Sequence, residues 1–273
     1  MLTLLHVSDL HFGVHSVPAQ VAAVERRITG GGYDVVVVSG DLTQRARARE
    51  FARARAFLEL AAAHSRVLAV PGNHDVTWWR APMHLAPAGW MYAKWRRYLG
   101  RETEPVVRVP GATLVGLNTA HGISRFTLTS RLRDLSVIGD LRDAQIARAA
   151  REFAQSPAGD RRVIVMHHNP VAGDLSRRYG LKHWAHVLDR CAALGVSVIL
   201  CGHDHQEKVH HVAGARGGIV VSTAGTTSTR SRGGCPGSVN ELRLESGAVA
   251  ARALVWNAAR GDLVPGEERR FAA

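Results

Sequence analysis

Short apolar runs that each lead into a small polar cluster constrain the fold of this chain more than any other feature. Runs of this length, bounded by Gly, Pro or Asp, are typical of buried strands. Polar residues at strand ends in a layered α/β fold are where sites are built. The runs are Leu2–Val7, Val35–Val38, Val67–Val70, Val163–Val165 and Val196–Leu200, and the clusters are Asp9-x-His11, Gly40-Asp41, Gly72-Asn73-His74-Asp75, Met166-His167-His168 and Gly202-His203-x-His205.

Strands and helices alternate through the first two-thirds of the chain, and short strands joined by Gly-rich turns follow Cys201. We therefore expect an α/β fold, a two-sheet β-sandwich flanked by helices. Neither a repeat nor a linker divides the chain, so we expect one domain over residues 1–273. The predicted helices are Val17–Ile28, Gln44–His64, Leu141–Gln155 and Lys182–Leu194, and the later strands are Val209–Val212, Gly218–Thr223, Val239–Leu244 and Val249–Val255.

Two segments interrupt this alternation. Thr77–Leu99 holds Trp78, Trp79, Trp90 and Trp95, four of the six tryptophans. It is either a helix packed on the core or an aromatic lid inserted at residues 77–99 beside the site, since it directly follows a polar cluster. Ala120–Ile138 is polar and contains arginine, and we expect a loop near the same face.

Composition excludes several classes of protein. The first residues lack the basic region and cleavage site of a signal peptide, and no apolar run reaches the roughly 18 residues of a membrane span. Cys191, Cys201 and Cys235 are odd in number and far apart, which supports neither a disulfide framework nor a thiolate zinc site. We therefore expect a cytoplasmic protein. The net charge of +12 suggests nucleic acid, but the arginines are scattered along helices beside Glu and Ala, which disfavours that partner.

The clusters supply ligands for divalent metals. Asp9 and His11 are two residues apart, so in an extended segment both side chains point the same way. His203 and His205 share this spacing, and Asp41 has two carboxylate oxygens with which to bridge two cations. Imidazole and carboxylate without thiolate suit manganese, iron, zinc, cobalt or nickel alike. Two aspartates against two divalent ions leave the site cationic, as phosphate chemistry requires.

The five clusters, in this order, resemble the D-x-H, G-D, G-N-H-D/E, H and G-H-x-H pattern of the calcineurin-like metallophosphoesterases, over about three-quarters of the chain. That family's fold is a β-sandwich flanked by helices. The resemblance implies two divalent metal ions (manganese, iron or zinc), with Asp41 shared between them. It also implies that His74 faces the substrate without binding metal, and that His168 lies beside the ligands or the substrate. The implied ligands are Asp9, His11, Asp41 and His205 for the first ion, and Asp41, Asn73, His167 and His203 for the second.

Departures from the family pattern narrow the substrate class. Serine/threonine protein phosphatases extend the second block to G-D-x-V-D-R-G, whereas residues 40–46 read Gly-Asp-Leu-Thr-Gln-Arg-Ala and lack the second Asp and the final Gly. The chain is closer to small bacterial phosphodiesterases of the cyclic-nucleotide and glycerophosphodiester type. The opening residues 6–13 also resemble repair exonucleases of the SbcD type, which are usually longer and carry a capping domain.

We therefore expect a dinuclear-metal phosphodiesterase that acts on a small-molecule phosphoester. A hydroxide bridging the metals would attack phosphorus, and His74 would protonate the leaving group as general acid. The alternatives are a metal-dependent nuclease and a non-catalytic scaffold on the same fold. Four further residues are candidates for substrate contacts: His121, His168, Arg45 and Arg125.

Overall fold

The computed structural model describes residues 1–80, 88–123, 127, 136–214 and 218–272. The strands of one sheet are β1 (Leu2–Val7), β2 (Val35–Val38), β3 (Arg66–Ala69), β10 (Ser238–Glu245), β11 (Ala248–Asn257), β12 (Asp262–Pro265) and β13 (Arg269–Ala272). Those of the other are β4 (Val106–Val109), β5 (Ala112–Gly116), β6 (Arg161–Val165), β7 (Val196–Cys201), β8 (Lys208–Val212) and β9 (Ile219–Thr223). The helices are α1 (Pro18–Gly31), α2 (Ala48–Ala62), α3 (Ala93–Tyr98), α4 (Asp143–Ala154) and α5 (Trp184–Ala193), with short 3-10 turns at Asn73–Asp75, Trp78–Arg80 and Ala88–Trp90.

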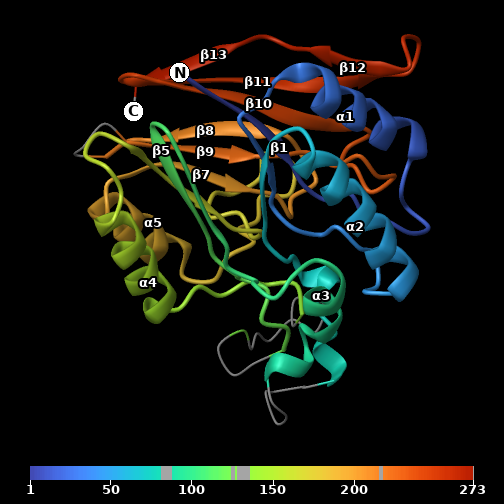
Figure 1. The fold of residues 1–273 in the computed structure, drawn as a ribbon, viewed down its shortest axis with the longest axis horizontal. Coiled ribbons are helices and arrows are strands. Elements are labelled where there is room, and N and C mark those ends of the chain that lie inside the picture. The colour runs from blue at the N-terminus through green and yellow to red at the C-terminus, as the bar shows by residue number, and fades with distance from the viewer. Residues whose placement is uncertain (81–87, 124–126, 128–135, 215–217, 273) are drawn as a thin grey trace.

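Two sheets packed face to face form the centre of the molecule, and helices cover both outer faces (Figure 1). The first sheet runs β12-β11-β10-β1-β2-β3, with β13 also paired to β11, and α1 and α2 lie on it (Figure 1). The second runs β4-β5-β6-β7-β9-β8, with α4 and α5 on its outer side (Figure 1). The two-sheet β-sandwich flanked by helices that the sequence predicts is confirmed.

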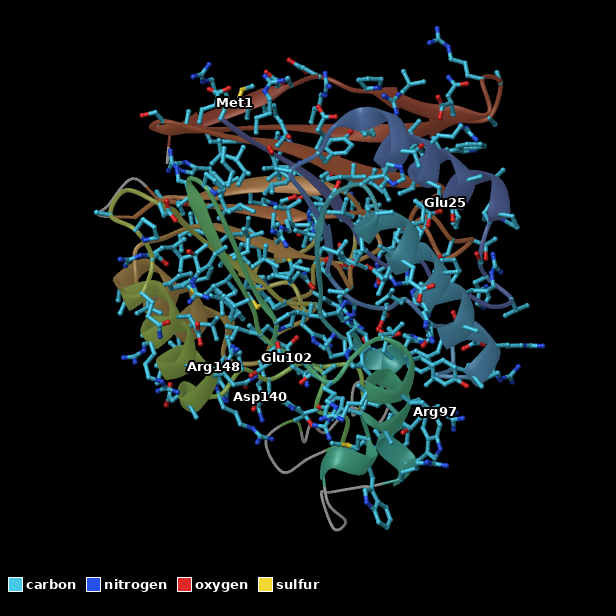
Figure 2. All side chains as sticks on the ribbon, in the orientation of Figure 1. Met1, Glu25, Arg97, Glu102, Asp140 and Arg148 are labelled. Carbon is cyan, nitrogen blue, oxygen red and sulfur yellow. The ribbon has the colours of Figure 1, made fainter. Side chains whose placement is uncertain are left out.

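The central strands are buried on both faces, which explains why they read as unbroken apolar runs. Leu4, Val35 and Val37 pack between the two sheets, where side chains fill the interior (Figure 2). Leu5 and Val36, one residue along, instead pack in the cluster that includes the buried face of α2. A third cluster joins the second sheet to α4 and α5. The polar loops that follow β1, β2 and β7 are therefore anchored by strands packed on both faces.

A buried histidine connects the two sheets. His6 of β1 lies with Nε2 2.9 Å from the Ser39 hydroxyl and Nδ1 3.1 Å from the Ser222 hydroxyl of β9. The Asn240 amide donates to the same Ser222 oxygen at 2.8 Å. Burial lowers the pKa of His6 to about 3, so this side chain is neutral in the folded protein.

The predicted helices and strands are found with shifts of a few residues at their ends, but four strands in the described part of the chain were not predicted. These are β4, β5, β12 and β13. β12 and β13 both pair with the long strand β11, β12 at its carboxyl end and β13 at its amino end. Their sequences mix charged and exposed residues with few apolar ones, so no hydrophobic period marks them.

The aromatic segment 77–99 packs on the core in its later part. Met91, Tyr92 and Trp95 are buried in the cluster that contains the inner face of α2, and the Trp95 indole donates to the Glu102 carbonyl at 3.0 Å. Residues 81–87 lie outside the described residues. A lid role for this segment stays a prediction, as does the single-domain organisation.

In the part of the chain that the structure describes, no helix combines the length and the apolar character that crossing a bilayer requires. The expected cytoplasmic location stays a prediction.

Candidate metal centre

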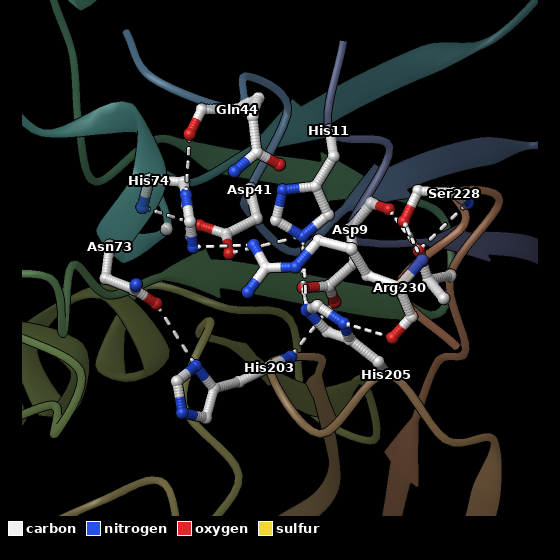
Figure 3. Close-up of polar contacts among 12 residues, drawn as sticks. Asp9, His11, Asp41, Gln44, Asn73, His74, His203, His205, Ser228 and Arg230 are labelled. Atoms are coloured by element: carbon white, nitrogen blue, oxygen red, sulfur yellow. Dashed lines mark hydrogen bonds and ion pairs between the residues drawn. The ribbon is translucent and has the colours of Figure 1, made fainter. Parts of the chain in front are cut away.

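The five polar clusters meet at one edge of the sandwich. They follow the carboxyl ends of β1, β2 and β3 in one sheet and of β6 and β7 in the other. Backbone hydrogen bonds continue the pairing of neighbouring strands into the loops that follow them. The Asp9 amide donates to the Gly40 carbonyl at 3.0 Å, and the Gly202 amide donates to the His167 carbonyl at 2.9 Å. Loops from both sheets therefore bring their side chains to one point (Figure 3).

Left-handed backbone conformations concentrate at this point. Non-glycine residues rarely adopt a positive φ, and such strain persists where the surroundings hold it for a purpose. Five of the seven predicted ligands have one: Asp9 (54°), His11 (44°), Asp41 (51°), His203 (69°) and His205 (56°). The fold therefore turns these side chains inward at an energetic cost.

Two glycines of the sequence motifs permit close approach between the loops. A Cβ on Gly40, whose φ is 101°, would lie 2.6 Å from Nδ1 of His167. A Cβ on Gly202 would lie 1.9 Å from the Ser8 hydroxyl and 2.4 Å from an Asp9 carboxylate oxygen. Glycine at these positions lets the ligand-bearing loops touch, as the sequence predicts for Gly40.

One half of the site gathers Asp9, His11, Asp41 and His205, whose ligand atoms lie within 4.8 Å of one another. Nδ1 of His205 donates to the Arg230 carbonyl at 2.9 Å, so Nε2 is the ring atom left to bind a metal. That Nε2 lies 3.1 Å from Oδ1 of Asp9 and 3.1 Å from Nε2 of His11 (Figure 3). Two ring nitrogens and a carboxylate oxygen therefore face one another at close range, as the ligands of one cation would.

The other half gathers Asn73, His167 and His203. Nδ1 of His167 donates to the Ser39 carbonyl at 2.8 Å, which leaves Nε2 directed into the site as the atom that would bind a metal. That Nε2 lies 3.2 Å from Oδ1 of Asn73 and 3.3 Å from Nδ1 of His203. His203 Nδ1 is in turn 3.1 Å from the same amide oxygen. Two imidazoles and one neutral oxygen thus face a common centre.

Asp41 lies between the two halves. Its Oδ1 accepts a hydrogen bond from the His74 amide at 2.8 Å. Its Oδ2 lies 3.7 Å from Nε2 of His11 and 3.5 Å from Nε2 of His167. The second oxygen is therefore placed between the two sets of nitrogens, where a bridging carboxylate belongs.

The electrostatics of the site favour positive charge. Burial raises the pKa of Asp41, but the adjacent histidines, His167 foremost, outweigh it and hold that pKa well below its usual range. The pKa of Asp9 is likewise held low, against burial, by His205 and His11. Burial opposes charge on His167, yet Asp41 and Asp9 raise its pKa to about 9. Two ionised, buried carboxylates with imidazole and amide donors around them fit a pair of divalent cations.

Asp75, to which the sequence assigns no role, binds two clusters together. Its Oδ2 accepts hydrogen bonds from the amides of Gly72 at 3.0 Å and Leu42 at 3.2 Å. Its Oδ1 accepts from the Thr43 amide at 2.8 Å and the Thr43 hydroxyl at 2.9 Å. Burial and the charge of Asp41 raise the pKa of Asp75 to about 7, while these four donors stabilise the carboxylate.

His74 faces a cavity of about 170 Å³ above the predicted ligands. Its Nδ1 donates to the Gln44 carbonyl at 2.7 Å, and its Nε2 accepts from Nη1 of Arg230 at 2.8 Å (Figure 3). The cavity lining is Asp41, Asn73, His74, Val137, His203, His205, Arg230 and Arg232.

Arg230 and Arg232 were not predicted. Both lie on the loop that follows β9. A hydroxyl of this loop holds it against the site, because the Thr226 side chain donates to the Asp9 carbonyl at 2.6 Å. The signal available in the sequence was the predicted strand Gly218–Thr223, because β9 is parallel to β7 and its carboxyl end faces the same edge.

None of the candidate substrate contacts that the structure describes lines the cavity above the predicted ligands. His168 is fully buried behind His203, with ring centroids 4.6 Å apart and Nδ1 2.7 Å from the Thr119 hydroxyl. His121 lies near the Tyr92 hydroxyl, and Arg45 is exposed; neither lines the cavity. Arg125 lies outside the described residues. From the segment 120–138, Val137 reaches the cavity, whereas no described residue of 77–99 does so.

The family model of calcineurin-like phosphoesterases matches residues 2–207, and the chain belongs to this family. A sequence search of curated proteins finds no match. Among solved structures, a dimetal phosphatase from Danio rerio is similar, with a TM-score of 0.65 and 12% identity over 99% of this chain and 98% of that one.

Two further structures share the fold. A purple acid phosphatase from yellow lupin (Lupinus luteus) seeds has a TM-score of 0.67 at 10% identity, covering 99% of this chain and 53% of the longer one. A single mutant of Vps29 from Entamoeba histolytica has a TM-score of 0.52 at 12% identity, covering 100% of this chain and 99% of that one. At such identities these likenesses show the fold alone.

Proposed function

We propose that this protein hydrolyses phosphoesters, with small-molecule phosphodiesters as its preferred substrates. The observation that carries the proposal is the position of Asp41: its Oδ2 lies between the Nε2 atoms of His11 and His167, at 3.7 and 3.5 Å. The preference for diesters rests on the sequence of the second cluster, which lacks the extension typical of protein phosphatases.

Two divalent cations would be held by the seven clustered side chains. Asp9, His11, Asp41 and His205 would bind one, and Asp41, Asn73, His167 and His203 the other. The donor types suit manganese, iron or zinc. Such a pair, when bound, supplies a more acidic water as nucleophile and neutralises charge on the phosphoryl group.

Side chains around the cavity would donate the proton and bind the phosphoryl group. His74 faces the cavity without belonging to either set of ligands, and Nε2 is the atom that would carry a proton to the departing oxygen. Its ring is oriented by the Gln44 carbonyl at Nδ1. Arg230 and Arg232 bring two guanidinium groups to the cavity, where they would bind the phosphoryl oxygens.

The test is hydrolysis of bis-p-nitrophenyl phosphate by protein reconstituted separately with manganese, zinc and iron. We expect turnover with at least one metal, faster than that of p-nitrophenyl phosphate, and loss of turnover on chelation. Absence of turnover with all three metals, in protein shown to contain them, would leave the non-catalytic scaffold as the better account. Faster cleavage of oligonucleotides than of small diesters would favour the nuclease.

A further inference from the structure

A second cavity, of about 230 Å³, adjoins the one above the metal centre. The two share Val137, His203 and Arg232 in their linings, so they lie side by side around these residues. Neither alone reaches the roughly 300 Å³ at which small-molecule sites begin, but together they do. A ligand with its phosphate at the metal centre therefore has room to extend past His203.

The chemistry of the second cavity is cationic and aromatic. Arg178 and Arg232 both line it, and no described residue of its lining carries a carboxylate. Arg232 is held in place, since its Nε donates to the Asp204 carbonyl at 2.6 Å and lies 3.2 Å from a carboxylate oxygen of the same residue. Val137 and Ile138 supply apolar surface. This combination suits a planar ring rather than an aliphatic amine.

Tyr179 supplies a preorganised aromatic surface. Its ring stacks on Trp184 with centroids 4.1 Å apart and an angle of 4° between planes. Tyr179 is nevertheless 39% exposed and lines the cavity. A ring already held by a neighbour loses little conformational freedom when a ligand packs against it.

Asn169 completes the cavity with a buried acceptor. Its Nδ2 donates to the Val171 carbonyl at 2.7 Å and to the Arg178 carbonyl at 3.3 Å, which fixes the loop that carries Tyr179. Its Oδ1 has no hydrogen-bond partner among the described residues, although Asn169 is only 1% exposed. Buried acceptors are normally satisfied, so this oxygen lacks a donor that a ligand reaching it could supply.

We propose that this second cavity binds the substituent of a phosphodiester that stays on phosphorus, and that it selects a substituent bearing an aromatic ring. The proposal rests on the proposed hydrolase function. His74 lines the first cavity but not the second, and the leaving oxygen must lie near His74 to receive its proton. The second cavity, on the side of His203 and Asn169, therefore takes the other ester group, which only a diester possesses.

The experiment compares two diesters with the same leaving group, phenyl p-nitrophenyl phosphate and methyl p-nitrophenyl phosphate, in manganese-loaded protein. Aromatic contacts of this kind contribute up to roughly 1.5 kcal/mol, or about tenfold. We expect Tyr179→Ala to lower kcat/KM about five- to tenfold for the phenyl ester, chiefly through KM, and to leave the methyl ester within about twofold. Tyr179→Phe should retain the wild-type selectivity. So should Trp90→Ala, which removes an exposed aromatic that lines neither cavity.

Binding of phenyl phosphate and methyl phosphate, measured by calorimetry on the same metal-loaded proteins, separates this proposal from the hydrolase itself. Tighter binding of phenyl phosphate that depends on Tyr179, without turnover of either ester, would support the subsite and refute the hydrolase. Equal losses on both esters in Tyr179→Ala, or equal binding of the two ligands by wild-type protein, would overturn the subsite.

Discussion

Nη1 of Arg230 lies 2.8 Å from Nε2 of His74, the atom from which a general acid would donate its proton. Nδ1 of the same ring faces the Gln44 carbonyl at 2.7 Å and must carry a proton, so the ring is neutral and Nε2 accepts from the guanidinium. His74 can be protonated at Nε2 only after Arg230 has moved away. A phosphate that draws the guanidinium to itself would free Nε2 to take up a proton from solvent, which the ring could then give to the departing oxygen.

This arrangement predicts that Arg230→Gln weakens phosphate binding and leaves the metals in place. The Arg230 contact with His205 is made by its main-chain carbonyl, which the substitution retains. We expect the inhibition constant of inorganic phosphate to rise about tenfold and kcat/KM to fall about 100-fold, with Arg230→Lys intermediate. Elemental analysis and phosphate inhibition provide the two readouts. Loss of metal with unchanged phosphate inhibition would show that the side chain supports the centre instead.

His74→Ala should lower turnover without lowering metal content, because His74 belongs to neither set of clustered ligands. The loss should be about 100- to 10,000-fold for diesters with alkyl leaving groups, which need a proton, and much smaller for p-nitrophenolate. Turnover of a matched pair of substrates, one with each leaving group, measures the difference. Equal losses on the two would argue against a general acid.

Asp75→Asn should destabilise the protein nearly as much as Asp75→Ala. Each carboxylate oxygen accepts from two donors, so either orientation of an asparagine amide places its NH₂ group against N–H donors. We expect a loss of about 2–4 kcal/mol in the free energy of unfolding, measured with denaturant. Asp189→Asn, at an exposed position of α5, should change it by less than about 0.5 kcal/mol. If Asp75→Asn left the free energy of unfolding unchanged, Asp75 would have to be protonated in the native protein.

The buried His6 predicts acid sensitivity. Its folded pKa of about 3 lies below the value of about 6.5 expected when unfolded, so the unfolded chain binds one more proton between these values. The contribution of neutral His6 is fully present above about pH 6.5 and is lost as pH falls toward 3. Between about pH 6.5 and 4.5 this amounts to roughly 2–3 kcal/mol.

The measurement is the free energy of unfolding as a function of pH for wild type and His6→Gln, both treated with chelator so that metal release does not contribute. Below about pH 6.5 the free energy of unfolding should fall less steeply with pH in the variant, by the slope that corresponds to uptake of about one proton. Parallel curves would show that His6 is not responsible.

The fold and the ligand clusters could be predicted because each leaves a pattern in a short stretch of sequence. A strand buried on two faces is largely apolar, and the polar residues that follow it mark the edge of the site, as β1 with Asp9 and β2 with Asp41 illustrate. Edge strands such as β12 and β13 carry no such signal, since one side faces solvent and partners lie on β11.

Residues that act through the topology could not be placed from the sequence. Arg230 and Arg232 belong to no motif, and the order of strands alone brings the loop after β9 to the site. Tyr179 likewise reaches the second cavity through a loop that Asn169 holds by a side-chain hydrogen bond to the Arg178 carbonyl. Left-handed φ values at Asp9, His11 and Asp41 also leave no mark in composition, because glycine would be the expected residue there.

The most direct test of this account is the metal content of wild-type protein and Asp41→Ala, measured by elemental analysis after equilibration with manganese and removal of free metal. The two nitrogens that face Oδ2 of Asp41 belong to opposite halves of the site, so removing this carboxylate should weaken both halves together. We predict two metal ions per wild-type chain and fewer than one in the variant. Two ions retained by Asp41→Ala, or none bound by the wild type, would contradict a centre built around this carboxylate.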